Sequence, residues 1–141
     1  MLHAQNDSAK APKNNVYLEL GGRGQFYSVN YERRIYKIKN VKGALALGGA
    51  KHNALGGWYT GLEHNVFIGN GIHNFEIGAG YNQLFFTNPD NTSEDHYING
   101  RIGYRLQPLE KGLMVRMGYT PFFRPKQTVL HWVGLSFGYS F

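Results

Sequence analysis

The last ten residues constrain the fold of this chain more than any other stretch. Large apolar or aromatic side chains stand at every second position, and glycine or serine stands between them. The bulky set is Val133, Leu135, Phe137, Tyr139 and Phe141. A period of two predicts a β-strand with one bulky apolar face and one nearly bare face. Phe141, the last residue of the sequence, belongs to the apolar face.

Seven upstream segments alternate in the same way, and they cover residues 16–21, 26–32, 41–48, 59–68, 74–82, 97–105 and 113–120. We expect turns or loops between them, including a tight turn at 21–24, a basic turn at 33–40 and loops at 87–95 and 121–127. The 19 glycines favour strands and tight turns over helices. Hairpin-length links join neighbouring strands, and eight strands close around an interior filled by side chains. The sequence therefore predicts an all-β fold, an eight-stranded antiparallel up-and-down barrel.

The barrel is expected to span residues 15–141, preceded by a lead-in at 1–14. This lead-in is polar and lacks periodicity, so we expect it to be disordered. Ala4 followed by Gln5 is typical of a signal-peptide cleavage point, so the segment reads as the remnant of an export signal. The chain has no cysteine, which excludes a disulfide framework. The net charge is +6, but the lysines and arginines do not cluster together with exposed aromatic residues, as nucleic-acid binding would require. We therefore predict no nucleic-acid partner.

The small and polar faces of the strands carry both signs of charge. They are Glu19, Glu32, Glu63 and Glu76 on four of the first five segments, and Arg101, Arg105 and Arg116 on the sixth and seventh. The bulky faces of eight strands would overfill so narrow a lumen, so they must point outward, and only lipid stabilises an outward apolar belt. The charges then lie inside, where they must pair. Inward aromatic side chains at Tyr17, Phe26, Tyr59, Tyr97 and Trp132 would fill the remaining space, so we predict a transmembrane barrel without an open pore.

The C-terminal strand resembles the recognition signal of bacterial outer-membrane β-barrel proteins, with Phe141 last and Tyr139, Phe137 and Leu135 at alternate positions. Residues 75–81 and 102–105 are similar to segments of small barrels of Bacteroidetes-type bacteria. The resemblance covers residues 15–141. It implies a bacterial outer-membrane location with both termini in the periplasm. It also implies contact with membrane lipid and lipopolysaccharide, and recognition of the last strand by the barrel assembly machinery.

A catalytic alternative rests on Ser93, Asp95, His96 and His131, which could meet at the outer rim. Eight-stranded outer-membrane acyltransferases use such residue types, and a histidine beside a carboxylate and a hydroxyl can act as a general base. No spacing here is diagnostic of that chemistry. The histidines His64, His73, His96 and His131 lack the spacing of a metal site, so we predict neither a metal nor another cofactor.

A second alternative is a soluble lipocalin-type ligand-binding barrel, which would need the apolar face inside. Lipocalins usually carry an N-terminal Gly-x-Trp and a C-terminal helix, and the sequence shows neither. The favoured prediction is a non-enzymatic outer-membrane barrel. We expect it to act as a structural or interaction subunit of a larger outer-membrane complex, with its lumen closed by Glu/Arg ion pairs.

Overall fold

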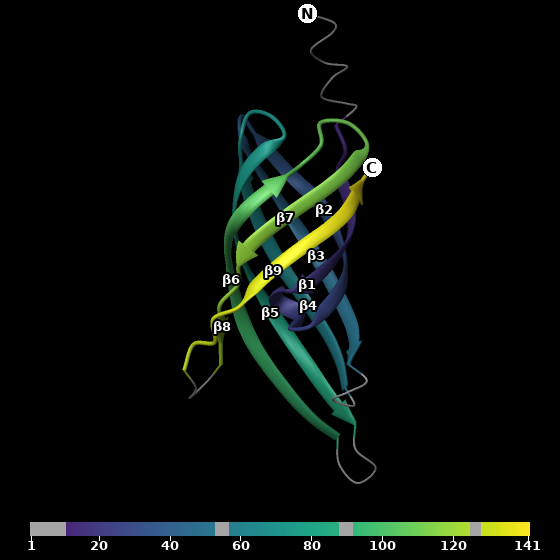
Figure 1. The fold of residues 1–141 in the computed structure, drawn as a ribbon, viewed down its shortest axis with the longest axis vertical. Coiled ribbons are helices and arrows are strands. Elements are labelled where there is room, and N and C mark those ends of the chain that lie inside the picture. Colours follow the sequence, from purple (N-terminus) through teal and green to yellow (C-terminus); the bar gives the residue numbers. More distant parts are fainter. Residues whose placement is uncertain (1–10, 53–56, 88–91, 125–127) are drawn as a thin grey trace, which may run out of the picture.

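The computed structural model describes residues 11–52, 57–87, 92–124 and 128–141, and nearly all of them lie in antiparallel strands (Figure 1). The strands are β1 (Asn14–Gly21), β2 (Tyr27–Ile38), β3 (Val41–His52), β4 (Gly57–Ile68), β5 (His73–Thr87), β6 (Thr92–Leu106), β7 (Gly112–Tyr119), β8 (Phe122–Phe123) and β9 (Val133–Ser140). One 3-10 helix, η1 (Gly22–Gly24), follows β1. No helix in these described ranges is long and apolar enough to cross a membrane.

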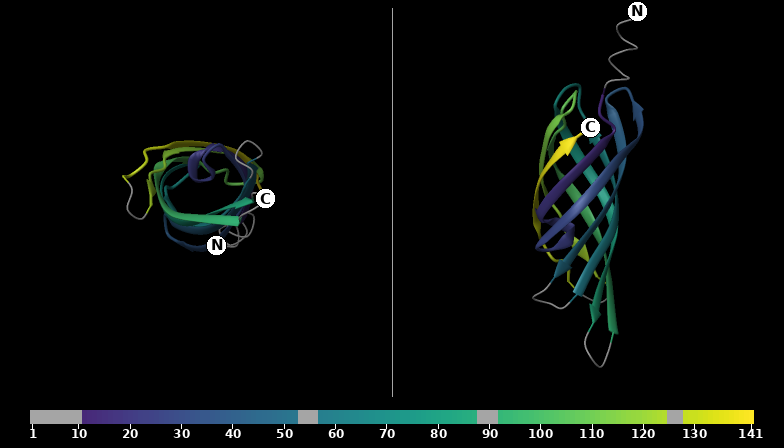
Figure 2. Two further views of the ribbon diagram at one scale, coloured as in Figure 1. Left: turned by 90° about the horizontal axis from the view of Figure 1, so that it is seen from below. Right: turned by 90° about the vertical axis from the view of Figure 1, so that its right-hand side faces the viewer.

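The strands close into a barrel. Each strand from β1 to β6 pairs with the next, β6 pairs with β7, and β9 pairs with both β7 and β1. The last pairing joins the two ends of the chain in register, with Leu18 opposite Phe137 and Val16 opposite Tyr139. Viewed from below, the strands form a continuous ring (Figure 2). Because β7 and the short β8 both pair with β6, they form one wall element. The predicted eight-stranded up-and-down barrel is confirmed.

The two faces of the wall differ as the alternation predicted. Among the described residues, 34 large hydrophobic side chains are exposed, whereas only nine hydrophobic residues are buried. The buried set is dominated by 20 polar or charged residues. In β9, Leu135, Phe137 and Tyr139 point outward while Ser136 and Ser140 are fully buried. The apolar face is therefore outside, and a lipocalin-type apolar interior is excluded.

Both chain ends lie at the same end of the barrel. The backbone N–H of Asn14 donates to the carbonyl of Phe141 at 3.0 Å, and the reverse bond measures 2.9 Å. The turns after β2, β4 and β6 lie at this end, which we call the terminal end (Figure 1). Helix η1 and the links after β3, β5 and β8 belong to the opposite end, which we call the loop end. Residues 1–10 of the expected lead-in lie outside the described residues, as do 53–56, 88–91 and 125–127 in the links.

Four local expectations were wrong. The loop expected at 87–95 is shorter, because Thr87 belongs to β5 and residues 92–95 belong to β6, where Asp95 pairs with Leu84. Residues 33–38 do not form a turn but continue β2, and the turn comes at Lys39, whose φ is 53°. A bulge between Arg34 and Tyr36 breaks the alternation there, which concealed the strand. Phe26 is 60% exposed, because the turn before it rotates it out of the interior.

The loop expected at 121–127 begins later than predicted. Phe122 and Phe123 pair with Asn99 and Ile98 of β6, so they extend the wall. Pro121 lacks an N–H, but its carbonyl still accepts a hydrogen bond of 3.0 Å from the N–H of Gly100. Pro121 therefore interrupts the strand without opening the wall.

Candidate functional site

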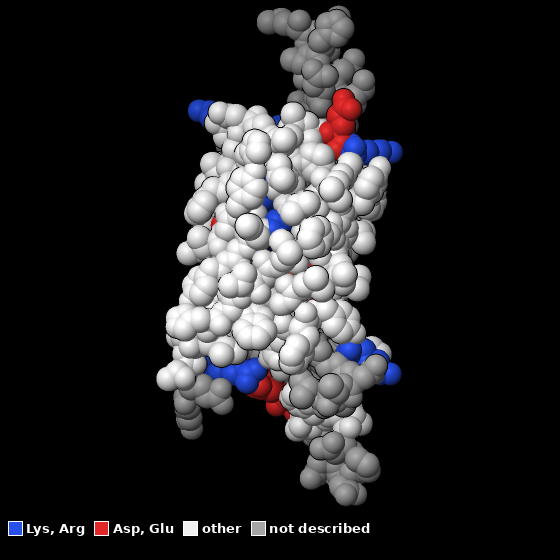
Figure 3. Space-filling view, in the orientation of Figure 1, with Lys and Arg blue, Asp and Glu red and all other residues white. Residues whose placement is uncertain are grey.

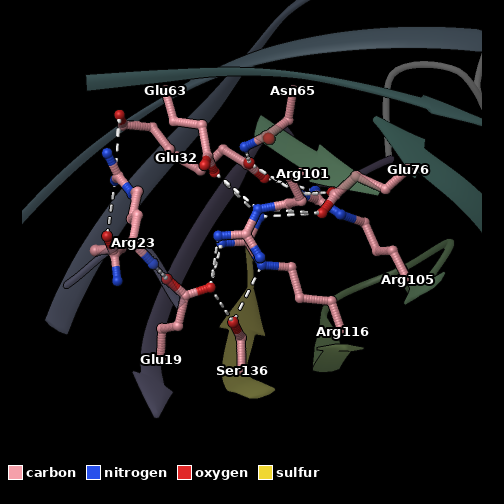
Figure 4. A network of polar contacts seen from close by, with 12 residues as sticks. Glu19, Arg23, Glu32, Glu63, Asn65, Glu76, Arg101, Arg105, Arg116 and Ser136 are labelled. Carbon is pink, nitrogen blue, oxygen red and sulfur yellow. Dashed lines mark hydrogen bonds and ion pairs between the residues drawn. The ribbon is translucent and has the colours of Figure 1, made fainter. Parts of the chain in front are cut away.

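The interior of the barrel holds a compact cluster of charged side chains contributed by six strands and one turn (Figure 4). Glu19 comes from β1, Glu32 from β2, Glu63 from β4, Glu76 from β5, Arg101 and Arg105 from β6, and Arg116 from β7. Each occupies an inward position of its strand, and each is at most 2% exposed. The structure thus brings together the seven residues proposed from the sequence.

Two guanidinium groups hold the centre of this cluster. Arg101 donates to Glu19 at 2.7 Å and to Glu63 at 3.1 Å. Arg116 donates to Glu19 at 3.2 Å and to Glu76 at 3.2 Å. Glu19 therefore joins both arginines through its carboxylate (Figure 4). A buried charge of this kind is tolerated only when paired and hydrogen-bonded.

A third guanidinium lies nearer the terminal end. Arg105 donates through two nitrogens to the two oxygens of Glu32, at 2.6 and 2.8 Å. This forked geometry is the strong, directional form of an arginine–carboxylate pair. Arg105 also forms an ion pair with Glu76, and its guanidinium lies 4.3 Å from the ring centre of Phe67. Glu76 thus connects the ion pairs of Arg116 at the centre of the cluster to the Arg105–Glu32 pair nearer the terminal end.

A fourth buried arginine, Arg23, was missed by the sequence interpretation. It lies in η1, which folds into the lumen (Figure 2). Its side chain is 0% exposed and donates to Asn30 at 2.8 Å, and its backbone N–H donates to Glu19 at 3.2 Å. Gly22 before it has a φ of +61°, and a Cβ there would approach Glu19 to 2.3 Å. Only glycine permits this approach.

With Arg23 included, the buried cluster holds four carboxylates and four guanidinium groups. The inward faces of the strands carry four glutamates, three arginines and the buried Lys42 of β3, whose charges already balance, so counting charges does not reveal Arg23. A charged side chain in a Gly-rich turn normally lies in water, so the predicted tight turn at 21–24 gave no reason to place Arg23 inside the barrel.

Amides and hydroxyls satisfy much of the remaining hydrogen-bonding capacity. Asn99 donates to Glu63 at 2.7 Å, Asn65 donates to Glu32 at 3.2 Å, and Ser136 donates to Glu19 at 3.2 Å. The Tyr17 hydroxyl accepts from Arg116 at 2.8 Å. Small residues such as Ser136 on β9 therefore leave room for the long side chains and also hydrogen-bond to them.

An aromatic cluster fills the interior between this network and the loop end. It consists of Tyr59, Leu84, Tyr97 and Phe122, with Trp132 packed against it. Tyr97 and Phe122 have ring centres 4.9 Å apart. The Trp132 indole N–H donates to the carbonyl of Gln25 at 2.9 Å, which links the residue just before β9 to the turn carrying Arg23. The described interior is therefore filled by charged side chains at its centre and aromatic side chains beyond.

The four catalytic candidates are not assembled into one site. Asp95 and His96 are neighbours on β6 and point to opposite faces, and Asp95 pairs with Arg124 at 3.4 Å. His96 is exposed and stacks on Tyr81, and His131 is exposed beside Tyr119. Ser93 is exposed near the loop end of β6. These four side chains therefore do not come together as a serine, histidine and aspartate group.

The histidines are distributed around the outer wall. His64 lies beside Tyr36, with Nε2 3.2 Å from the hydroxyl, and His73 lies beside Tyr104. In the described ranges no group of three or more His, Cys, Asp or Glu residues could hold a metal ion. The residues of the proposed assembly signal, Leu135, Phe137, Tyr139 and Phe141, are between 38% and 52% exposed on the outer face.

Comparison with known proteins supports the fold. No family model matches the chain, and no curated protein matches it either. Among solved structures, it is similar to the N-terminal β-barrel domain of Pseudomonas aeruginosa OprF, with a TM-score of 0.64 and 14% sequence identity. The match covers 94% of this chain and 98% of that domain. At this identity the shared feature is the architecture: the chain is a closed eight-stranded antiparallel β-barrel with the fold of that domain.

Proposed function

We propose that this protein is a non-enzymatic integral barrel of the bacterial outer membrane. The exposed apolar belt carries the proposal, because contiguous apolar surface of this extent is stable only against lipid. On the face shown in Figure 3, most acidic and basic residues gather near the two ends, and only small charged spots are visible in the band between them. The barrel architecture shared with the OprF domain is consistent with this placement. Membrane lipid and lipopolysaccharide would then surround the wall.

Behaviour in detergent tests this placement. The folded protein is expected to need detergent or lipid to stay in solution, and to migrate differently on denaturing gels before and after heating. A heated sample of the same protein is the control for the unfolded band. Recovery of the folded protein in the aqueous fraction without detergent would contradict the proposal.

The lumen is proposed to be closed, so the barrel has a structural rather than a conducting role. The Glu/Arg cluster and the aromatic cluster beside it occupy the described interior. Planar-bilayer recordings of the reconstituted protein are expected to show no steady conductance. Glu63→Ala, which removes an interior carboxylate bonded to Arg101 and Asn99, is the comparison most able to open a path. A steady large conductance of the unaltered protein would contradict a closed lumen.

An accessory role in a larger outer-membrane complex is the finer part of the proposal. It is supported by the absence of an assembled catalytic site among the described residues and by the extent of the outer wall and rims. Purification from native outer membrane in mild detergent, followed by mass spectrometry, is expected to recover stoichiometric partner proteins. A second small barrel of the same membrane, purified identically, controls for chance association. Recovery of this chain alone would contradict the role.

The last strand is proposed to be the signal read by the barrel assembly machinery. Phe141 suits this role, because its side chain is 43% exposed while its backbone is paired with Asn14. Phe141→Ala is expected to lower the amount of protein inserted in cells and to leave refolding of the pure protein in detergent unchanged. Phe123→Ala, at an outward phenylalanine of β8, is the matched control. Equal insertion of both variants would contradict the signal.

Both termini are proposed to lie in the periplasm, which would place the terminal end on that side. The chain has no natural cysteine, so a single introduced one is a unique label. Leu109→Cys in the β6–β7 turn marks the terminal end, and Glu94→Cys on β6 marks the loop end. An impermeant thiol reagent on intact cells is expected to label only Glu94→Cys. Labelling of Leu109→Cys alone would reverse the orientation.

A further inference from the structure

The two rims of the barrel differ in charge. The terminal end carries Lys13, Arg33, Arg34, Lys37, Lys39 and Lys111, against the side chain of Glu110. The described part of the loop end carries Lys51 and Arg124, against Glu94 and Asp95. The described part of the terminal rim is therefore strongly basic, whereas the described part of the loop rim is close to neutral.

Most of the basic side chains line one open groove. This groove has a volume of about 740 Å³ and is formed by Lys13, Arg33, Arg34, Ile35, Tyr36, Lys37 and Lys39. Its lining contains five cations and no acidic residue. Among the described residues, the ion pairs outside the lumen are limited to Arg124 with Asp95, so the cations of the groove have no carboxylate within ion-pair distance. Within the described part of the chain, these cations are available to an external anion.

The local fold explains why the cations gather there. The backbone N–H of Arg34 donates to the carbonyl of Lys13 at 2.7 Å, which brings the entry segment beside β2. The bulge between Arg34 and Tyr36 adds one unpaired residue to β2. The extra residue Ile35 and the next residue, Tyr36, are both exposed, at 51% and 36%, next to Lys37. Cations and apolar side chains therefore share one outward surface, which is typical of a membrane–water interface.

An apolar track leads from the groove along the wall. Arg33 and Tyr31 occupy the same outward face of β2, and they pair with Leu45 and Leu47 of β3. Tyr31 is 42% exposed, Leu45 38% and Leu47 59%. Val29, two residues beyond Tyr31, is 55% exposed and continues the track. A ligand seated here meets positive charge at one end and hydrocarbon-like surface along its length.

We propose that this groove binds the phosphate of an anionic glycerophospholipid, whose acyl chains lie along Tyr31, Leu45 and Leu47. The inference rests on the proposed membrane location. Beyond that location, the inference names the class of lipid and the position of its headgroup on the barrel. The phosphodiester contacts Arg33 and Lys37. The electrostatic field that attracts it is strengthened by Lys13, Arg34 and Lys39. Each cation near an anionic lipid surface contributes an attraction that corresponds to about a fivefold change in affinity.

Native mass spectrometry of the folded protein, released from mild detergent with added phosphatidylglycerol or phosphatidylcholine, tests the proposal. Phosphatidylglycerol is expected to bind in preference to phosphatidylcholine. Lys37→Gln should raise the dissociation constant for phosphatidylglycerol about fivefold, and Arg33→Gln with Lys37→Gln about 25-fold. Lys51→Gln is the matched control, because it removes an exposed strand lysine from the loop end. It should leave the constant unchanged.

Three outcomes would overturn the proposal. Equal affinity for the two lipids would remove the anionic preference, and equal effects of Lys37→Gln and Lys51→Gln would remove the site. Displacement of phosphatidylglycerol by millimolar inorganic phosphate would show that free anion, not lipid, is the ligand. The variants are compared only as heat-modifiable folded protein, so a folding defect is recognised separately. A protein that fails to enter bilayers contradicts the membrane location, whereas one that inserts without lipid preference contradicts only this groove.

Discussion

The inner and outer faces of the same strands differ more than any two separate regions of the barrel. On β9, Ser136 is fully buried against the charged cluster, while its neighbours Leu135 and Phe137 stand exposed on the wall. A soluble protein buries large apolar residues such as leucine and phenylalanine, and it exposes charged residues. The inversion teaches that two environments direct this fold. Lipid stabilises the outer face, and internal balance of charge and hydrogen bonds stabilises the inner face.

The inner face is stabilised by specific ion pairs and hydrogen bonds. Removing a single charged side chain there should therefore have the largest effect on stability. Glu19→Ala removes one of the carboxylates that pair with both Arg101 and Arg116, and it leaves each of these buried cations one partner short. We expect a loss of about 3–5 kcal/mol in the free energy of unfolding. Urea unfolding in detergent micelles measures it, with exposed Glu110→Ala as the control. Similar small losses in both variants would show that the interior tolerates an unpaired charge.

The outer face is held by its surroundings, so the effect of a charge there should depend on depth. Leu18→Arg places a cation in the middle of β1 on the apolar face, where Leu18 is 42% exposed. In a bilayer we expect a loss of about 2–4 kcal/mol in folding free energy, against about 0–1 kcal/mol for Leu113→Arg at the terminal end of β7. Refolding titrations into lipid vesicles measure both values. Equal costs at the two depths would contradict a wall that faces hydrocarbon.

Helix η1 offers a smaller change that sharpens the comparison, because Arg23 reaches the inner face from a turn. Its side chain bonds a neutral amide and the carbonyl of Ala46 rather than a carboxylate. Arg23→Ala is therefore expected to lower the free energy of unfolding by about 1–3 kcal/mol, less than Glu19→Ala. The exposed rim residue Arg33 provides the control. Arg33→Ala should change the free energy of unfolding by less than about 0.5 kcal/mol. If η1 lies outside the lumen in solution, the two arginine variants will match.

Much of the fold could be read from the sequence because a period of two assigns every residue of a regular strand to a face. The predicted strands and their inward charges follow from that rule, as Glu63 on β4 and Arg101 on β6 illustrate. The rule failed where regularity ended. The bulge after Arg34 concealed the end of β2, and counting across the first turn placed Phe26 inside. Pro121 suggested a loop although the following residues extend the wall.

The sequence by itself determined the number of strands and the character of their two faces, because alternation is a local property of an extended backbone. Only the tertiary structure decided which charges meet. Glu19 and Arg116 are 97 residues apart, and closure of β1 on β9 and β7 on β9 brings them to 3.2 Å. Only the structure revealed that Arg23 turns inward, since this requires Gly22 at a positive φ beside Glu19. Such pairings depend on barrel closure, which no local pattern encodes.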